Sequence, residues 1–197
     1  GKDNIERFRR EPPYGWIVPQ AQWDPPTAAA MLDRMMQQGV EVANAEKSFV
    51  CDGIPYPAGT WVVPMSQPFA GFVKTMFEEQ RFHDLLKYPA LWEGLVRPQP
   101  FPDASLPPYD QVGWTLPYQM GVKAVAANTP LEVPLRPMEK VVPPAGKLEA
   151  SAAAAYLISP KTNNSFIAVN RLLKKGAEVA RAREEFSDGA QKYVAGT

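Results

Sequence analysis

Few side chains in this sequence have the types and spacing that enzymatic chemistry requires. The chain has one cysteine, Cys51, and one histidine, His83. A cysteine nucleophile needs a base that raises its thiolate fraction, and His83 is the candidate for that role. However, Cys51 lies in a Phe-Val-Cys-Asp-Gly sequence, which is typical of a hairpin turn rather than of a nucleophile elbow. A hydrolase that uses Cys51 and His83 is therefore the least favoured function, and hydrogen-bond distance between the two side chains would support it.

Metal and phosphate sites are not predicted either. Catalytic zinc needs three protein ligands and an open position, and the sequence has no His-x-x-Glu motif and no second histidine. The glycine-rich signatures of dinucleotide and phosphate loops are also absent from the sequence. We therefore expect no catalytic residue, no metal ligand and no cofactor in this chain.

Tryptophan side chains are the remaining candidates for ligand binding, because they can stack on sugars or bases. Trp16, Trp61 and Trp114 lie in strand or helix patterns, and we expect them in the core. Trp23 and Trp92 lie in loops. These two are the aromatic side chains that we expect to be available to a ligand.

The composition is that of an ordinary globular region without a nucleic-acid partner. Hydrophobic residues make up 45% and charged residues 21%, and 21 basic residues balance 21 acidic ones. A nucleic-acid-binding domain usually has a basic excess, and no apolar run approaches the ~20 residues that cross a bilayer. Proline is abundant, at 22 residues, and its pairs stand at segment ends, where they separate short elements.

One stretch of the sequence occurs twice. Residues 31–49 and 168–186 align without a gap at an offset of 137. Apolar positions fall on apolar positions at helical spacing, and polar positions fall on polar ones. We therefore expect two copies of one structural unit. Identical residues at this offset include Arg34 and Arg171, Gly39 and Gly176, Glu41 and Glu178, Val42 and Val179, and Phe49 and Phe186.

Each copy predicts a strand, a helix, a second strand and a hairpin. The strands are expected at 15–18 and 40–43 in the first copy and at 155–158 and 177–180 in the second. A strand–helix–strand crossover of this length pairs its strands in parallel. The fold class expected is therefore α/β, with small, mostly parallel sheets, flanking helices and an edge hairpin.

The helix boundaries follow from capping residues. In the first copy the helix is expected to begin after Asp24, with proline in its first turn, and in the second after Asn163 or Asn164. Each helix is expected to end at a glycine. Ser66 is expected to cap a further helix at 68–82, whose apolar side chains recur at helical spacing.

The domain organisation follows from the repeat and from the prolines. Residues 1–12 are expected to be an N-terminal tail, and 13–128 a first α/β unit with a proline-rich insertion at 87–108. Residues 129–146 are expected to be a linker, and 147–197 a second, incomplete copy of the unit. In the first copy the return strand of the hairpin is expected at 61–64. The second copy stops before this strand, so we expect the polypeptide to continue beyond its last residue.

Three strings of the sequence carry a family resemblance. They lie at 13–19, 56–69 and 108–117, and include Pro-Met-Ser-Gln-Pro-Phe and Trp-Thr-Leu-Pro. Together they resemble the region downstream of the catalytic domain in large bacterial zinc carboxypeptidase-like proteins. Those proteins resemble carboxypeptidase A in their N-terminal part and have an amidotransferase-like segment toward the C-terminus. The resemblance covers most of 13–121 and, more loosely, 156–197.

The resemblance implies a non-catalytic accessory or structural domain. It would pack against the peptidase domain, or position substrate for it, with other domains of the same polypeptide as partners. The family's His-x-x-Glu pair, distant histidine and catalytic glutamate have no matching positions here, so zinc is expected only in the peptidase domain of the parent protein. The resemblance further implies a flavodoxin-like or amidotransferase-like repeated unit and a periplasmic or secreted location.

A binding module is the alternative function. Ligands of α/β proteins bind at the C-terminal ends of parallel strands, where the loops after the first strand of each copy would lie. The binding residues expected on this alternative are Gln20, Trp23, Asn163, Asn164 and, from its own loop, Trp92. The ligand would be a small molecule or a glycan.

Overall fold

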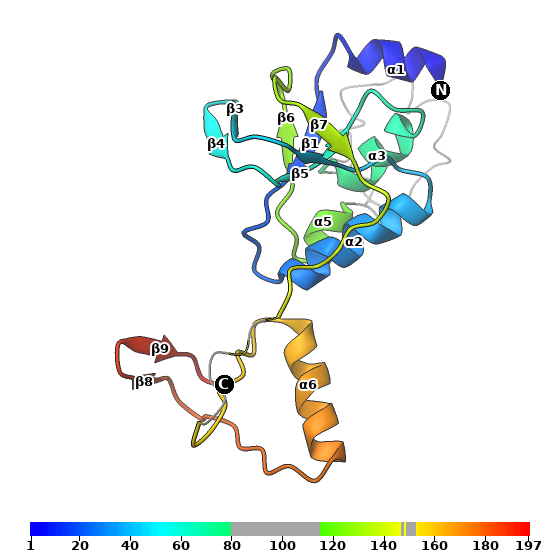
Figure 1. The fold of residues 1–197 in the computed structure, drawn as a ribbon. Coiled ribbons are helices and arrows are strands. Elements are labelled where there is room, and N and C mark those ends of the chain that lie inside the picture. The colour runs from blue at the N-terminus through cyan, green and yellow to red at the C-terminus, as the bar shows by residue number, and fades with distance from the viewer. Residues whose placement is uncertain (80–114, 147, 149–152) are drawn as a thin grey trace, which may run out of the picture.

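The computed structural model describes residues 1–79, 115–146, 148 and 153–197. Within these ranges the chain forms an N-terminal part, residues 1–146, that contains the main sheet, and a C-terminal part, residues 153–197 (Figure 1). In chain order the elements are α1 (Lys2–Phe8), β1 (Gly15–Val18), α2 (Pro25–Gln37), β2 (Ala43–Ala45), β3 (Phe49–Cys51), β4 (Ile54–Tyr56), β5 (Trp61–Pro64), α3 (Ala70–Phe77), α5 (Leu116–Gln119), β6 (Val125–Ala127), β7 (Leu135–Pro137), α6 (Asn163–Lys174), β8 (Phe186–Asp188) and β9 (Gln191–Tyr193).

The main sheet is antiparallel throughout, so the predicted mostly parallel, flavodoxin-like or amidotransferase-like sheet is wrong. Its five described strands have the order β6-β1-β5-β2-β7, and every neighbouring pair is antiparallel. Strands β1 and β2, which α2 connects, do run in the same direction. However, β5 lies between them and pairs with both. The crossover pattern predicts the direction of the two strands but not which strand inserts between them.

The core of the N-terminal part lies on both faces of the central strands. Trp16 and Val63 pack with the helices in one cluster of buried residues. Ile17 and Val62 pack with the β3–β4 hairpin in the other. This alternation follows from the two-residue period of a strand. Strands β1 and β5 are nearly continuous apolar runs because both of their faces are covered.

Helix α2 has the boundaries that its sequence predicts. Its N-cap is Asp24, whose side chain accepts a hydrogen bond from the backbone of Thr27, and two prolines occupy its first turn. Beyond its C-terminus, Gly39 has a positive φ of 90°, the left-handed conformation that favours glycine. The strand predicted at 40–43 forms further along, as β2.

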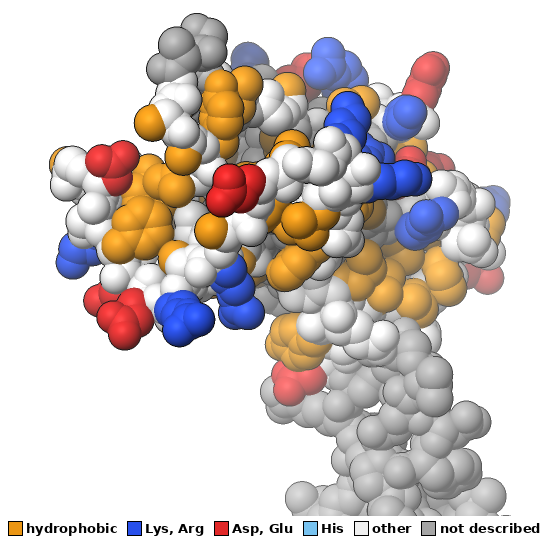
Figure 2. Space-filling model, turned by 90° about the horizontal axis from the view of Figure 1, so that it is seen from below, with side chains coloured by type: hydrophobic (Ala, Val, Ile, Leu, Met, Phe, Trp, Pro, Cys, Tyr) orange, Lys and Arg blue, Asp and Glu red, His pale blue; other side chains and the backbone are white. Residues whose placement is uncertain are grey.

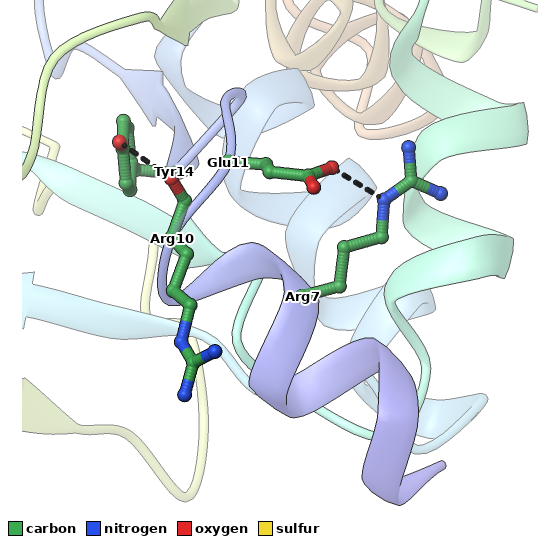
Figure 3. A network of polar contacts seen from close by, with 4 residues as sticks. All are labelled: Arg7, Arg10, Glu11 and Tyr14. Atoms are coloured by element: carbon green, nitrogen blue, oxygen red, sulfur yellow. Dashed lines mark hydrogen bonds and ion pairs between the residues drawn. The ribbon is translucent and has the colours of Figure 1, made fainter.

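The segment expected to be an N-terminal tail contains helix α1. Phe8 of this helix is buried, and α1 contacts α3. Two contacts link the end of α1 to the chain that enters β1 (Figure 3): Arg7 Nε lies 2.9 Å from Glu11 Oε2, and the hydroxyl of Tyr14 donates to the carbonyl of Arg10 at 3.2 Å. Both side chains of the ion pair are mostly exposed, so burial of Phe8 does more than this pair to hold α1 in place.

The C-terminal part has the same local geometry as the first copy of the repeated sequence. Both hairpins are antiparallel with the same register at the offset of 137, and both helices are followed by a glycine with positive φ. The backbone N–H of Gly59 donates to the carbonyl of Ala45, and that of Gly196 donates to the carbonyl of the equivalent Ala182. The rings of Phe49 and Tyr56 stack with their centres 5.3 Å apart, and those of the equivalent Phe186 and Tyr193 stack at 5.2 Å.

Three expectations for the C-terminal part were wrong. Neither 155–158 nor 177–180 forms a strand. The N-cap of α6 is Thr162, and the predicted caps Asn163 and Asn164 are the first two residues of the helix. The strand at 155–158 is missing because its equivalent in the N-terminal part, β1, pairs with β5, and no strand occupies that place in the described C-terminal part. Of residues 40–43, the equivalent of 177–180, only Ala43 lies in a strand and pairs with β5.

The helix predicted at 68–82 is observed as α3, Ala70–Phe77, and residues 80–82 lie outside the described part of the chain. Its N-cap is Phe69, not the predicted Ser66. Val73 and Phe77 of this helix are buried, as their spacing predicts, whereas Phe72, expected on the same buried face, is 38% exposed.

Candidate functional site

The two loops that were expected to bind a ligand contact one another. Lys161 Nζ lies 5.0 Å from the centre of the Trp23 ring, a distance at which a cation and an aromatic face attract. The backbone N–H of Asn163 donates to Asp24 Oδ2 at 2.8 Å, and Asn163 Nδ2 donates to Thr27 Oγ1 at 3.0 Å. The predicted residues of both copies therefore meet at a junction between the N-termini of α2 and α6.

Asp24 is the centre of this junction. Its carboxylate accepts three hydrogen bonds: from Thr27 N at 3.2 Å, from Thr27 Oγ1 at 2.8 Å and from Asn163 N at 2.8 Å. The first turn of a helix has backbone N–H groups without partners in the helix, and its partial positive charge favours an anion. One carboxylate thus satisfies N–H groups of two helices. Its capping of α2 follows from the sequence, whereas its bond to α6 has no signal in the sequence.

The other predicted binding residues that the structure describes are exposed. Trp23 is 68% exposed, and Gln20, also exposed, donates from Nε2 to the carbonyl of Gly59 in the turn before β5. Asn164 is exposed. Trp92 lies outside the described residues. Of the predicted ligand-binding aromatics, Trp23 is therefore the one that the structure places at the surface, with Lys161 beside its ring.

Cys51 is buried in the cluster beneath the β3–β4 hairpin. Its Sγ lies 3.5 Å from Thr129 Oγ1 and 3.9 Å from the carbonyl oxygen of Thr129. His83, its predicted partner in a hydrolase, lies outside the described residues. The surroundings of the cysteine are those of a packed apolar side chain.

Two further features concern the described residues only. They contain no group of three histidine, cysteine or acidic side chains that could hold a metal ion. Their helices are all too short or too polar to cross a bilayer.

The main surface feature is a set of exposed apolar side chains on the C-terminal part. No residue described between 153 and 197 is buried. Viewed from the side of α6 and the β8–β9 hairpin, hydrophobic side chains are exposed in several places between charged ones (Figure 2). The large exposed side chains of this part, which we call the apolar surface, are Tyr156, Leu157, Phe166, Ile167, Leu172, Leu173, Val179, Phe186 and Val194.

Several side chains of the apolar surface are buried at the equivalent positions of the N-terminal part. The difference is large although the residues are of the same kind, because β1, β5 and their neighbours cover α2 and nothing described covers α6. Sequence reasoning missed this surface, since an apolar helix face predicts burial. Met35 is 2% exposed and its equivalent Leu172 is 38% exposed. The exposed fractions are 2% for Val42 and 37% for its equivalent Val179, and 9% for Phe49 and 36% for its equivalent Phe186.

A shallow depression lies on the C-terminal part between the segment that precedes β8 and the turn that follows β9. It is lined by Arg181, Ala182, Arg183 and Ala195. Within the described residues neither arginine forms a salt bridge. The first three positions are equivalent to residues 44–46, which include most of β2, so the depression lies where the N-terminal part has a paired strand.

Comparison of the chain with models of known protein families, with curated proteins and with solved structures finds no match.

Proposed function

We propose that this chain is a non-catalytic accessory module that docks onto another domain of the same polypeptide through the apolar surface of its C-terminal part. The observation that carries the proposal is the contrast between α2 and α6. The two helices have matching apolar faces, yet α2 buries Met31, Leu32 and Met35, and α6 buries no residue. Apolar side chains gathered on a surface mark sites of protein interaction.

The partner domain is proposed from the family resemblance. The strings at 13–19, 56–69 and 108–117 resemble the region downstream of the catalytic domain in zinc carboxypeptidase-like proteins. On this proposal the partner is a zinc carboxypeptidase-like domain, zinc is bound there, and the whole protein is periplasmic or secreted. The module then packs against the peptidase domain or positions its substrate.

Burial of the apolar surface would contribute to the free energy of such docking. Full burial of one large apolar side chain contributes about 1.5–3 kcal/mol. Phe166, Leu172 and Leu173 are 59%, 38% and 53% exposed, so each would contribute roughly half of that value, against the roughly 4–15 kcal/mol that association costs in rigid-body freedom. Domains of one polypeptide lose less of that freedom, because the linker keeps them at a high effective concentration.

The test titrates the intact chain with the peptidase domain of the same polypeptide and measures the binding by calorimetry. Leu173→Lys, on the apolar surface, is expected to weaken binding at least tenfold. Ile54→Lys is the matched control, because Ile54 is exposed to a similar degree, 47% against 53% for Leu173, but lies on the β3–β4 hairpin. The proposal is contradicted if the wild-type chain does not bind, or if both variants bind as the wild type does.

A second candidate function is a binding module for a small molecule or glycan, and the exposure of Trp23 favours it. Fluorescence of Trp23 would change on titration with oligosaccharides, and Trp23→Ala would remove the change. Absence of any change that depends on Trp23 would exclude this site.

A further inference from the structure

We propose that the β3–β4 hairpin is a flap, which opens from the main sheet as one unit and is held closed by a clasp at its tip. The clasp consists of Cys51 and Asp52 in the hairpin and of Asn128 and Thr129, which follow β6. The inference goes beyond the proposed docking function, because it concerns a conformational change within the N-terminal part.

The flap contacts the main sheet through side chains and not through strand pairing. In the described part of the chain, β3 and β4 pair with each other and with no strand of the main sheet. The hairpin lies on the side of the main sheet away from α3 (Figure 1). Contacts between apolar side chains are not directional, so the flap can separate from the sheet without breaking a hydrogen-bonded ladder. The side chains in this contact include Phe49, Cys51 and Tyr56 of the flap and Ile17, Val62 and Ala127 of the main sheet.

The clasp is centred on the Thr129 hydroxyl and the Asp52 carboxylate. The backbone N–H of Asp52 donates to Thr129 Oγ1 at 3.3 Å, and Cys51 Sγ lies 3.5 Å from the same oxygen. Asp52 Oδ2 accepts from the backbone N–H of Asn128 at 2.8 Å and from Asn128 Nδ2 at 3.3 Å. Asp52, Asn128 and Thr129 are exposed, so water can replace these bonds and the net contribution of each is modest. The clasp therefore favours the closed flap and can be released.

The second hairpin of the chain indicates that the flap keeps its structure after it opens. Strands β8 and β9 pair in the register of β3 and β4 at the offset of 137, and the rings of Phe186 and Tyr193 stack as those of Phe49 and Tyr56 do. However, Phe186 is 36% exposed, whereas Phe49 is 9% exposed. The same hairpin thus forms where no described residue buries it. Its pairing depends on contacts within the hairpin, so β3–β4 can move as a unit.

A fixed base and two short exposed segments provide the hinge of the flap. At the base, the backbone N–H of Gly59 donates to the carbonyl of Ala45 at 2.7 Å, and that of Ala45 donates to the carbonyl of Thr60 at 2.9 Å. Residues 46–48 connect this base to β3, and residues 57–58 connect it to β4; all five are exposed. Hinges are typically a few loop residues at the ends of elements, which absorb the change in backbone angles.

The thiol of Cys51 reports the opening directly. Cys51 is the single cysteine of the chain and is 2% exposed, so an aromatic disulfide reagent reaches it only when the flap opens or the whole chain unfolds. The Cys51 thiolate attacks one sulfur of the reagent, and the other half leaves as a coloured thiolate. The experiment measures this labelling on the intact chain at increasing urea concentrations below the unfolding transition.

The urea dependence separates a local opening from global unfolding. The flap exposes little surface when it opens, so the labelling rate is expected to be nearly independent of urea. It is also expected to be at least about tenfold faster than the global unfolding equilibrium allows. A rate that follows global unfolding at every urea concentration overturns the proposal.

A variant in the other core cluster provides an independent control. Met35→Ala removes apolar contacts beneath α2, in the cluster of buried residues that does not include the hairpin. It is expected to lower the urea midpoint of unfolding and to leave the labelling rate of the native chain unchanged. If labelling instead accelerates in proportion to the loss of stability, the thiol is exposed by global unfolding and the flap is wrong.

A matched pair of threonine variants tests the clasp. Thr129→Val retains the shape of the side chain and removes the hydroxyl that contacts Asp52 and Cys51. It is expected to accelerate labelling by about threefold or more. Thr75→Val removes a hydroxyl that donates to the carbonyl of Gly71 within α3, and is expected to leave labelling unchanged. Equal labelling rates of the two variants overturn the clasp.

Hydrogen exchange tests whether the hairpin moves as a unit. The amides within the β3–β4 ladder are expected to be more protected than the thiol, because the hairpin retains its pairing in the open form. Equal protection of the amides and the thiol would mean that the hairpin unfolds locally, which overturns the flap. These measurements need no partner domain, so their failure leaves the proposed docking function untouched.

Discussion

The carboxylate of Asp24 accepts a hydrogen bond from the backbone N–H of Asn163, 139 residues away, at 2.8 Å, while it also caps its own helix. Asp24 is buried, and its oxygens are occupied by groups of α2 and α6. This one side chain therefore ties the start of the C-terminal part to the start of α2.

Replacement of this carboxylate should affect both helices. We expect Asp24→Ala to lower the free energy of unfolding by about 1–2 kcal/mol through loss of the α2 cap. It should also speed hydrogen exchange of the Asn163 amide, because that N–H loses its acceptor. Asp33→Ala is the control, since Asp33 accepts one exposed hydrogen bond, from Gln37 within the same helix. Unchanged exchange at Asn163 would contradict the link between the two helices.

Equivalent positions of the two copies should differ in their effect on stability. We expect Met35→Ala to cost about 2–5 kcal/mol, because it leaves a cavity in a packed core. Leu172→Ala at the equivalent position should cost less than about 1 kcal/mol, because Leu172 is 38% exposed. Urea unfolding followed by circular dichroism measures both. A similar cost at the two positions would mean that the face of α6 is covered in the isolated chain.

Gln67 is a buried side chain whose hydrogen bonds satisfy backbone groups of Glu41 and Pro64. Its Oε1 accepts from the backbone N–H of Glu41 at 2.8 Å, and its Nε2 donates to the carbonyl of Glu41 at 3.1 Å and to that of Pro64. Gln67→Leu removes all three bonds, and we expect a loss of about 2–3 kcal/mol in urea unfolding. The exposed Gln38→Leu should change stability by less than about 0.5 kcal/mol. If Gln67→Leu and Gln38→Leu changed the free energy of unfolding equally, the hydrogen bonds of the Gln67 side chain would contribute nothing to stability.

Asp52 should make stability depend on acid pH. Hydrogen bonds from the backbone N–H of Asn128, and from the side chains of Thr129 and Asn128, hold the pKa of Asp52 below its usual value of 3.8. A lowered folded-state pKa stabilises the fold above the unfolded-state pKa, and this contribution is lost as pH falls through the folded-state value. Wild-type stability should therefore fall more than that of Asp52→Asn below about pH 4.

Urea unfolding of both proteins across the acid range measures this difference, and a carboxyl titration by NMR locates the pKa of Asp52 directly. Parallel stability curves for the wild type and Asp52→Asn would contradict the prediction.

Local structure was largely predictable from the sequence. Strand β1 and strand β5 form at the predicted residues, 15–18 and 61–64. Helix α2 begins after Asp24 and is followed by Gly39 in the left-handed conformation. These features depend on capping groups, turn residues and the apolar period, which act over a few neighbouring residues. The sequence alone therefore determined where most of these elements lie.

The tertiary structure decided how the elements combine. The insertion of β5 between β1 and β2 made the main sheet antiparallel, because pairing partners are selected by packing across the whole sheet. Burial also differs between the two copies, although α2 and α6 have nearly the same apolar pattern. The apolar face of α2 is buried because β5 and its neighbours cover it. The apolar face of α6 is exposed because no strand takes that place in the described structure. Periodicity shows which face of a helix is apolar, but burial of that face depends on a partner surface distant in the sequence.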